Sequence, residues 1–217
     1  MIEKKDEIEL CERIGGIEIP KHLRRTKTRT EKIYEVALKR QHDITIVLEN
    51  VHDVHNISAC LRSADATGLS TVHVVNSILP SPFRKIGTKT SAGTKKWVET
   101  VKWKSIEECY RKLKEEGFAI YATYLGEENN SLHEIDFTKK TAIVFGNEHS
   151  GVSDLARELS DGTMIIPQVG MSESLNISVA CAVTLYEAYR QKDKVRAYSA
   201  GKMSESNKEL FFKMLDK

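Results

Sequence analysis

Three stretches of the chain combine residue types that could hold a nucleoside or a phosphate. They are Asn56–Arg62, Gly146–Gly151 and the longer run of residues 163–180. An asparagine at a helix start and an arginine about two turns later could hold a phosphate and its ribose on one face. Glycine lets a ligand approach the backbone, and the glutamate of the second stretch can accept hydrogen bonds from a hydroxyl or from the arginine. Each stretch taken singly favours a structural turn. The order and spacing of all three, each directly after an apolar run, favour a ligand site.

The third stretch contains the longest loop of the three. Pro167 ends the apolar strand before it, and Gly170 allows backbone conformations closed to other residues. Ser174 and Asn176 are residue types that cap helix N-termini with a side-chain oxygen. Long ordered loops at the carboxyl ends of strands often bind ligands in α/β proteins. An ordinary strand-to-helix connection is the alternative.

Other common chemistries lack their signatures. The sequence has no phosphate-binding P-loop pattern, no strand followed by G-x-G-x-x-G and no G-x-S-x-G elbow. His52 and His55 could converge on a metal, but no third ligand lies nearby in the sequence, and we expect no metal. The cysteines are widely spaced and fit neither a zinc site nor a disulfide framework, so we expect reduced thiols. They are Cys11, Cys60, Cys109 and Cys181.

The elements that must position these stretches alternate between strands and helices. Strands are predicted at residues 44–48, 71–75, 97–101, 118–124, 141–145 and 163–166, and helices at 56–67, 105–117, 153–159 and 176–191. This alternation predicts an α/β fold with a mostly parallel sheet flanked by helices. The helix at 176–191 is apolar on most sides, so we expect it to be buried in the core or against a partner chain. Residues 210–212 could form a small docking helix or a frayed end.

Composition is that of a globular protein with an uneven charge distribution. The 217 residues are 40% hydrophobic and 29% charged, with a net charge of +2. No apolar run approaches the roughly 18 residues of a membrane span, and the start lacks the apolar core of a secretory signal, so we expect a cytoplasmic protein without membrane contact. Between residues 21 and 32, six basic residues stand against Glu31 alone. This segment could bind RNA phosphates or could be a solvated surface.

Taken together, the three stretches resemble the motifs of the SpoU-type, or TrmH-type, 2′-O-ribose RNA methyltransferases of the SPOUT superfamily. The similar motifs are Asn56-x-x-Ala59-x-x-Arg62, Gly146-Asn147-Glu148-x-x-Gly151, and Ile166-Pro167 through Ser174-Leu175-Asn176-Ile177-Ser178-Val179-Ala180. The resemblance covers about residues 28–191. Thr28-Arg29 and Tyr186-Glu187-Ala188 are similar to the branch that acts on tRNA guanosine.

This resemblance implies S-adenosylmethionine as methyl donor, a deep C-terminal trefoil knot and an obligate homodimer with the site at its interface. It also implies residue roles. The catalytic positions are Arg62, Asn56, Glu148, Ser174 and Asn176, and the methyl-donor positions are Thr123, Gly146, Ile166, Met171 and Leu175. Arg62 would activate the ribose 2′-OH. We favour Arg62 as a clamp that positions a phosphate and stabilises the incipient alkoxide, because arginine stays protonated in proteins. Which group removes the proton from the 2′-OH stays open.

The expected organisation is a basic N-terminal arm at residues 1–27, a methyltransferase domain at 28–191 and a short tail at 192–217. From Thr28 the spacing of apolar residues also predicts an amphipathic helix. We expect the arm and the start of this helix to supply RNA affinity through Arg24, Arg25, Lys27, Arg29 and Lys32. The expected activity is 2′-O-methylation of structured RNA, first of all at a guanosine in the D-loop of tRNA. The alternatives are an rRNA methyltransferase, a non-catalytic RNA-binding protein on the same scaffold and, more distantly, a flavodoxin-like binding protein.

Overall fold

The computed structural model describes residues 10–77, 97–126, 129–172, 174–199 and 201–217. The chain divides into two compact units. The larger unit is Gln41–Val195, and the smaller unit combines the residues up to Arg40 with Arg196–Lys217. The expected boundaries were at residues 27 and 191, so residues 28–40 group with the chain termini rather than with the sheet. No helix among the described residues is long and apolar enough to cross a membrane.

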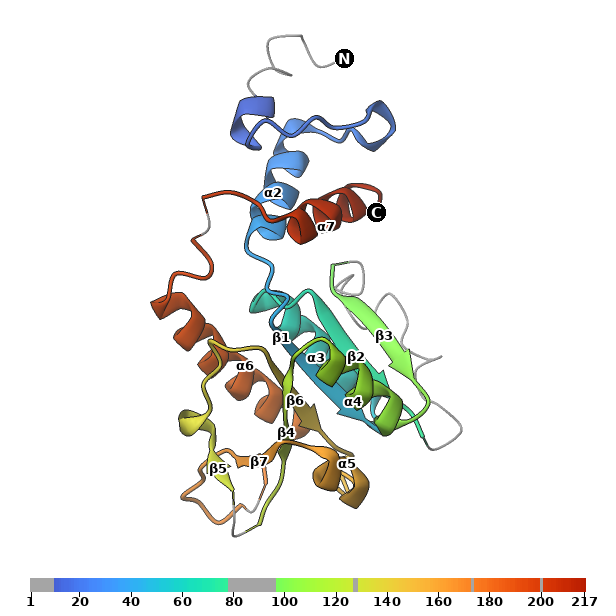
Figure 1. The fold of residues 1–217 in the computed structure, drawn as a ribbon, viewed down its shortest axis with the longest axis vertical. Helices are drawn as coiled ribbons and strands as arrows, with labels where there is room; N and C mark the ends of the chain where they lie inside the picture. Colours follow the sequence, from blue (N-terminus) through green and yellow to red (C-terminus); the bar gives the residue numbers. More distant parts are fainter. Residues whose placement is uncertain (1–9, 78–96, 127–128, 173, 200) are drawn as a thin grey trace. The chain divides into compact units, whose positions relative to one another are not determined.

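The larger unit is built on a seven-stranded sheet in the order β3-β2-β1-β6-β4-β7-β5 (Figure 1). Its strands are β1 (Ile44–Glu49), β2 (Thr71–Val75), β3 (Glu99–Trp103), β4 (Ala119–Thr123), β5 (Asn130–Ser131), β6 (Thr141–Phe145) and β7 (Gly162–Ile165). Every paired neighbour in it runs parallel, which confirms the predicted parallel α/β fold. β1 and β6 are buried along their whole length, as expected of parallel strands covered on both faces. The two-residue strand β5 was not predicted.

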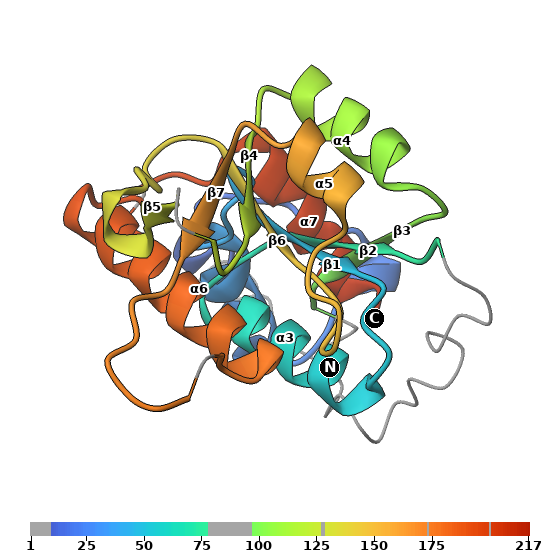
Figure 2. The ribbon, with the colours of Figure 1, turned by 90° about the horizontal axis from the view of Figure 1, so that it is seen from below.

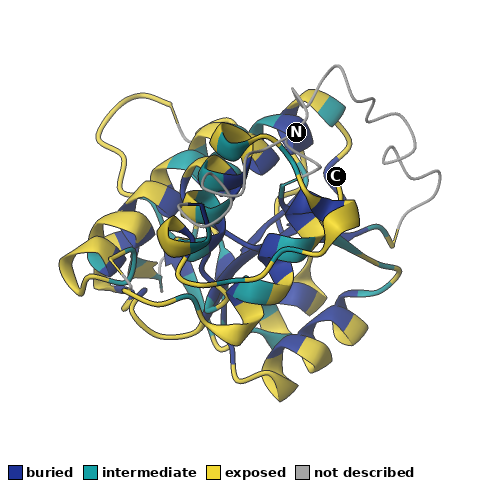
Figure 3. Cartoon of the chain, turned by 90° about the horizontal axis from the view of Figure 1, so that it is seen from above, coloured by how far each residue is buried: buried dark blue, intermediate teal, exposed yellow. Residues whose placement is uncertain are grey.

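Helices cover both faces of this sheet (Figure 2). They are α3 (Val54–Ala66), α4 (Ile106–Glu115), α5 (Asp154–Leu159) and α6 (Ile177–Lys194), with a short 3-10 helix η4 (Leu132–Glu134). α3 and α6 pack on one face over residues such as Ile46, Ile143 and Phe145, and α4 and α5 pack on the other over Val47 and Val144. In Figure 3 the strands are buried beneath helices whose outward faces are exposed. This layering brings α3 and α6 into direct contact.

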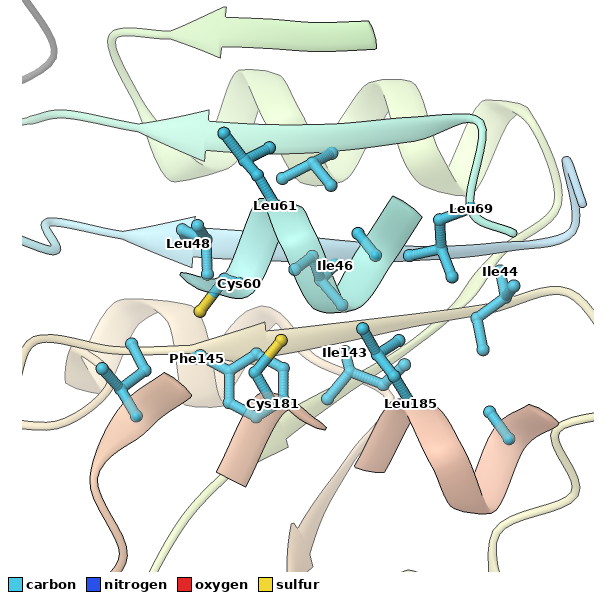
Figure 4. Packing of buried hydrophobic residues seen from close by; sticks show 14 of the residues in the cluster. Ile44, Ile46, Leu48, Cys60, Leu61, Leu69, Ile143, Phe145, Cys181 and Leu185 are labelled. Atoms are coloured by element: carbon cyan, nitrogen blue, oxygen red, sulfur yellow. The ribbon is translucent and has the colours of Figure 1, made fainter. Parts of the chain in front are cut away.

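The contact between α3 and α6 contains a pair of thiols. Cys60 of α3 and Cys181 of α6 face each other above the sheet (Figure 4). A hydrogen bond with Cys60, together with burial, raises the pKa of Cys181 well above its usual value. All four cysteines lie within the described residues and are free.

The smaller unit pairs helices from the two ends of the chain. It contains η1 (Lys21–Leu23), α2 (Lys27–Leu38) and α7 (Glu205–Leu215). The rings of Tyr34 and Phe211 meet edge to face at 5.9 Å. Asn207 donates hydrogen bonds to the carbonyl oxygens of Leu38, the last residue of α2, and of Arg40, which follows the C-cap. The apolar residues near the C-terminus therefore belong to a helix that docks on α2, one of the two outcomes left open by the sequence.

Candidate active site

The first and second stretches meet where the order of strands in the sheet reverses, between β1 and β6. From β1 the chain moves to β2 and β3 on one side, whereas β6 pairs with β1 on the other side. The loops that follow β1 and β6 therefore leave neighbouring strand ends at the point where the strand order reverses, which is where open α/β sheets bind ligands. Residues 50–53 follow β1 at this point, and residues 146–151 follow β6.

A hydrogen-bond network joins three of the predicted catalytic residues at these strand ends. The amide nitrogen of Asn56 donates to Glu148 Oε1 at 3.0 Å, and the amide nitrogen of Asn176 donates to Asn56 Oδ1 at 3.2 Å. Glu148 also accepts from the backbone N–H groups of His52 and Asp53, both at 3.4 Å. A carboxylate at this position is favoured by the N-terminal end of α3. The network thus ties α3, the loop after β6 and the start of α6 together.

The structure corrects the predicted role of Asn56 as a helix cap. α3 begins two residues earlier than expected, and its N-cap is Asp53, whose Oδ1 accepts from the N–H of His55 at 2.8 Å. Aspartate caps as well as asparagine does, and the Glu148 carboxylate adds a second acceptor at this end. Asn56 therefore lies inside the first turn, where its side chain can face Glu148. In contrast, Asn176 caps α6 as predicted, with its Oδ1 accepting from the N–H of Ser178 at 2.8 Å.

Arg62 is not brought to this network. Its side chain is exposed on α3, and no hydrogen bond or ion pair joins it to another residue of the described chain. Arg62 lies six positions after Asn56, which sets the two side chains roughly 120° apart around the helix axis because each residue turns about 100°. The two side chains do not share the single face that the spacing suggested.

A cavity of about 620 Å³ lies at the carboxyl ends of β4, β6 and β7. Its size is within the roughly 300–1,000 Å³ usual for small-molecule sites. The predicted methyl-donor residues Thr123, Gly146, Ile166 and Leu175 line it, and so do Ser174, Asn176 and Glu148. Met171 is fully exposed in the loop before α6 and is not part of the lining.

A tight turn requires glycine at position 146. A Cβ at this position would lie 2.0 Å from the carbonyl carbon of Gly151. Asn147 and Gly151 close the turn with two backbone hydrogen bonds of 2.9 Å, and the Asn147 side chain donates to the carbonyl of Asn50 at 2.8 Å. Sequence reasoning did not assign a role to Asn147 or Asn50. The turn is held on both sides, so Glu148 projects from a rigid loop.

The cavity is also lined by residues that sequence reasoning did not select as site residues. Among them are Tyr124, Leu125, Asp154 and Arg157. The guanidinium of Arg157 lies over the Tyr124 ring, 4.1 Å from its centroid, and donates a hydrogen bond to the Asp154 carboxylate. The position of Tyr124 directly after the predicted methyl-donor residue Thr123 is a signal that could have identified it.

Two other candidates from the sequence are a metal site and the histidines. No group of three or more His, Cys, Asp or Glu side chains in the described part of the chain is arranged to hold a metal ion. His73 accepts a hydrogen bond from Trp103 Nε1 at 2.9 Å, and burial lowers its pKa to about 4. It is therefore a neutral structural histidine at physiological pH.

The five predicted RNA-binding residues all belong to the smaller unit, in and before α2. Arg24, Arg29 and Lys32 are exposed, whereas Arg25 and Lys27 are partly buried. Thr26 caps α2 by accepting from the N–H of Arg29. The cap sets the start of α2 within this basic segment, so that Arg24 and Arg25 precede the helix and Lys27, Arg29 and Lys32 lie in it.

Comparison with known proteins gives consistent matches. The family model described as "SpoU rRNA Methylase family" matches residues 43–186. The tRNA (guanosine(18)-2′-O)-methyltransferase of Thermus thermophilus is 44% identical over 191 residues, which cover 88% of this chain and 95% of that protein. The protein of the same name from Escherichia coli K12 is 39% identical over 171 residues, covering 79% and 73%.

Solved structures agree with the sequence matches. The TrmH/SpoU tRNA modifying enzyme of A. aeolicus superimposes with a TM-score of 0.79 at 35% identity, covering 87% of this chain and 95% of that one. The SpoU methyltransferase AviRb from Streptomyces viridochromogenes, in complex with the cofactor AdoMet, superimposes with a TM-score of 0.61 at 26% identity, covering 72% and 64%.

Proposed function

This chain belongs to the SpoU methylase family, and we propose that it transfers a methyl group from S-adenosylmethionine to a ribose 2′-oxygen of RNA. The preferred substrate is a guanosine in the D-loop of tRNA, because relatives named tRNA (guanosine(18)-2′-O)-methyltransferase match most of the chain at 37% to 44% identity. The observation that carries the proposal is the cavity at the ends of β4, β6 and β7, which opens beside the network of Asn56, Glu148 and Asn176. The family also implies the trefoil knot.

The cavity fits the methyl donor. Ile166 and Leu175 offer apolar walls for a flat adenine ring, and free backbone groups at the strand ends can read its edge. Thr123 is held by a hydrogen bond from its hydroxyl to the carbonyl of Val144 at 2.9 Å, so this wall is rigid. S-adenosylmethionine, when bound, supplies a methyl group on a positively charged sulfonium. We keep Met171 as a predicted contact from the loop before α6.

The chain's own residues would orient the ribose and stabilise charge on its 2′-oxygen. In our proposal Arg62 clamps an RNA phosphate and stabilises the alkoxide that develops as the hydroxyl loses its proton. Asn56 and Glu148 hold the start of α3, and thereby set the position of the helix that carries Arg62. Ser174 and Asn176 would face the Arg62 of a second copy of the chain. A crossed arrangement of this kind accounts for the absence of a contact between Arg62 and the network of its own chain.

A homodimer is therefore part of the proposal. α6 exposes Val179, Val183, Tyr186 and Tyr189, with 37% to 56% of each residue accessible. These residues follow one another at intervals of three and four, so they form one apolar stripe along the helix. A stripe of this kind beside the cavity suits an interface with a second copy. We also propose a cytoplasmic location, where the RNA substrate is found, and no metal requirement.

The proposal can be tested by methyl transfer from labelled S-adenosylmethionine to separated, unmodified tRNA and rRNA pools. We expect label in tRNA, and mapping should place it on the 2′-oxygen of a D-loop guanosine. A tRNA transcript with adenosine at the mapped position is the matched control and should lose the label. Label in rRNA alone would favour the alternative suggested by relatives named 23S rRNA (guanosine-2′-O-)-methyltransferase RlmB, which are 38% identical over 162 residues. Absence of label from both pools would contradict the proposal.

A further inference from the structure

The charged side chains of the cavity are unevenly distributed. Glu148 is already held by Asn56 and by backbone N–H groups at the start of α3. Asp154 and Arg157 of α5 stand apart from this network, and Arg157 is the only lysine or arginine among the described residues that line the cavity. Ile166 and Leu175, which also line the cavity, are apolar. The lining therefore offers apolar side chains for a ring and a charged pair for a polar group.

Arg157 is held in place by its surroundings. Its guanidinium lies 4.1 Å from the centroid of the Tyr124 ring and donates to the carboxylate of Asp154. The Tyr124 ring is itself confined, because a Cβ on Gly126 would lie 2.2 Å from the ring carbon Cε1. The backbone N–H of Tyr124 also donates to the carbonyl of Met164 at 3.0 Å. The cation is thus preorganised beside the cavity, which lowers the entropy lost when it binds an anion.

The methyl donor has a charged end that needs such a partner. S-adenosylmethionine and its product carry an α-amino acid, with an anionic carboxylate and a cationic ammonium, and apolar walls cannot pair with these groups. An aspartate beside an arginine offers one charge of each sign at close range. We propose that Asp154 and Arg157, braced by Tyr124, form the subsite for the amino-acid end of the methyl donor. Arg157 pairs with the carboxylate and Asp154 with the ammonium; this inference rests on the proposed function.

Calorimetric titration of the full-length protein with three ligands tests the subsite without measuring activity. S-adenosylhomocysteine carries the whole amino acid, decarboxylated S-adenosylmethionine lacks the carboxylate, and 5′-methylthioadenosine lacks the amino acid. Arg157→Ala should weaken the binding of S-adenosylhomocysteine about tenfold, which is the usual cost of one lost charge-assisted hydrogen bond. The affinities for the other two ligands should stay within about twofold of their values in the unsubstituted protein. Asp154→Asn should weaken the binding of both ligands that carry an ammonium and leave the affinity for 5′-methylthioadenosine unchanged.

A matched control is available on the neighbouring helix α4. Arg111 forms a similar exposed pair with Glu115, at 3.2 Å, away from the cavity, and Arg111→Ala should change none of the three affinities. Equal losses for S-adenosylhomocysteine and 5′-methylthioadenosine in Arg157→Ala, or no loss for either, would overturn the subsite while the proposed function stands. Unchanged affinity for all three ligands combined with weaker RNA binding would assign Arg157 to the RNA instead. Failure of the unsubstituted protein to bind any of the three ligands would contradict the proposed function itself.

Discussion

At the scale of single residues, Asn56 connects the parts of the candidate site. Its amide nitrogen donates to Glu148 from the loop after β6, and its amide oxygen accepts from Asn176 at the start of α6. Asn56 itself belongs to α3 and is buried. An amide is one of the few side chains that can donate at one atom and accept at another, so neither aspartate nor leucine could replace it here. This explains why an asparagine stands inside a helix, where its propensity is poor.

The first prediction separates a role in chemistry from a role in this network. Arg62→Ala should reduce methyl transfer by at least about one hundredfold, the cost of removing one stabiliser of developing charge, while binding of the methyl donor survives. Because Arg62 is exposed, the free energy of unfolding should change by less than about 0.5 kcal/mol. Single-turnover methylation, calorimetry and urea unfolding measure the three quantities.

Asn56→Ala is the contrasting variant. It leaves the Glu148 carboxylate and the Asn176 amide without their partner, so it should lower the free energy of unfolding by about 1 to 3 kcal/mol as well as the rate. Near-normal methylation by Arg62→Ala would remove Arg62 from the mechanism.

Sequence reasoning identified the members of the network better than their local roles. Asn56, Glu148 and Asn176 were selected, and the structure brings them together. The role of Asn56 as a cap was wrong, because Asp53 competes for the same position and the choice depends on where Glu148 sits. The pairing of Tyr124 with Arg157 could not be predicted, since it depends on β4 and α5 meeting in space.

At the scale of elements, Glu187 organises the side chains that anchor the far end of α6. Glu187 accepts from Arg190 Nε at 2.8 Å and Nη2 at 2.6 Å, and from Gln191 at 2.9 Å. Gln191 in turn donates to the carbonyl of Ile135 and accepts from the N–H of Phe137. These bonds fasten the helix that bears the exposed apolar stripe to the segment after η4. Hydrogen bonding from Arg190 lowers the pKa of Glu187 to about 2.

The second prediction uses this pKa. Because it is lowered from 4.5 in the unfolded chain to about 2 in the fold, Glu187 stabilises the protein above pH 4.5, and this contribution is lost as the pH falls towards 2. Glu187→Gln should therefore lower the free energy of unfolding by about 1 kcal/mol at pH 7. This is less than the pKa shift alone implies, because solvent around the half-exposed Arg190 screens the pair. The difference from the unsubstituted protein should shrink between pH 4.5 and 2. Urea titrations at several pH values measure it.

Glu115→Gln is the control for this experiment. Glu115 forms an exposed pair with Arg111 on α4, and its removal should change stability by no more than a few tenths of a kcal/mol. A difference between Glu187→Gln and the unsubstituted protein that stayed constant from pH 7 to pH 3 would show that the charge of Glu187 does not stabilise the fold.

The long elements of the larger unit could be predicted because their apolar patterns reflect burial on one or both faces. The strands at β1, β2 and β6 begin where the apolar runs begin, and the helix at α6 starts at its predicted cap. The short strand β5 could not be predicted, because two residues carry no periodicity. The length of α7 was also missed, since its buried face depends on α2, which lies far away in the sequence.

At the scale of the whole molecule, the apolar stripe of α6 predicts the oligomeric state. Val183→Asp should convert the proposed homodimer into a monomer, because the interface would have to bury an unpaired charge. Val195→Asp is the matched control. Val195 is also an exposed valine, at 59%, but it follows the last residue of α6, beyond the stripe. Sedimentation should give half the mass for the first variant and an unchanged mass for the second.

If the site is shared between copies, Val183→Asp should also lose methyl transfer although every proposed catalytic residue is intact. A fully active monomer would contradict the shared site, and an unchanged dimer would place the interface elsewhere.

The charge on the smaller unit leads to the final prediction, which concerns RNA. Each phosphate contact releases counterions, so the logarithm of the binding constant falls with the logarithm of salt concentration by about 0.7 to 0.9 per contact. Replacing the exposed residues Arg24, Arg29 and Lys32 with glutamine should therefore flatten this slope by about 2 and weaken tRNA binding most at low salt. Glutamine at Lys202, Lys208 and Lys213 removes equal charge from the same unit and should leave the slope nearly unchanged. If both triple variants flattened the slope equally, net charge rather than the basic segment would explain RNA affinity.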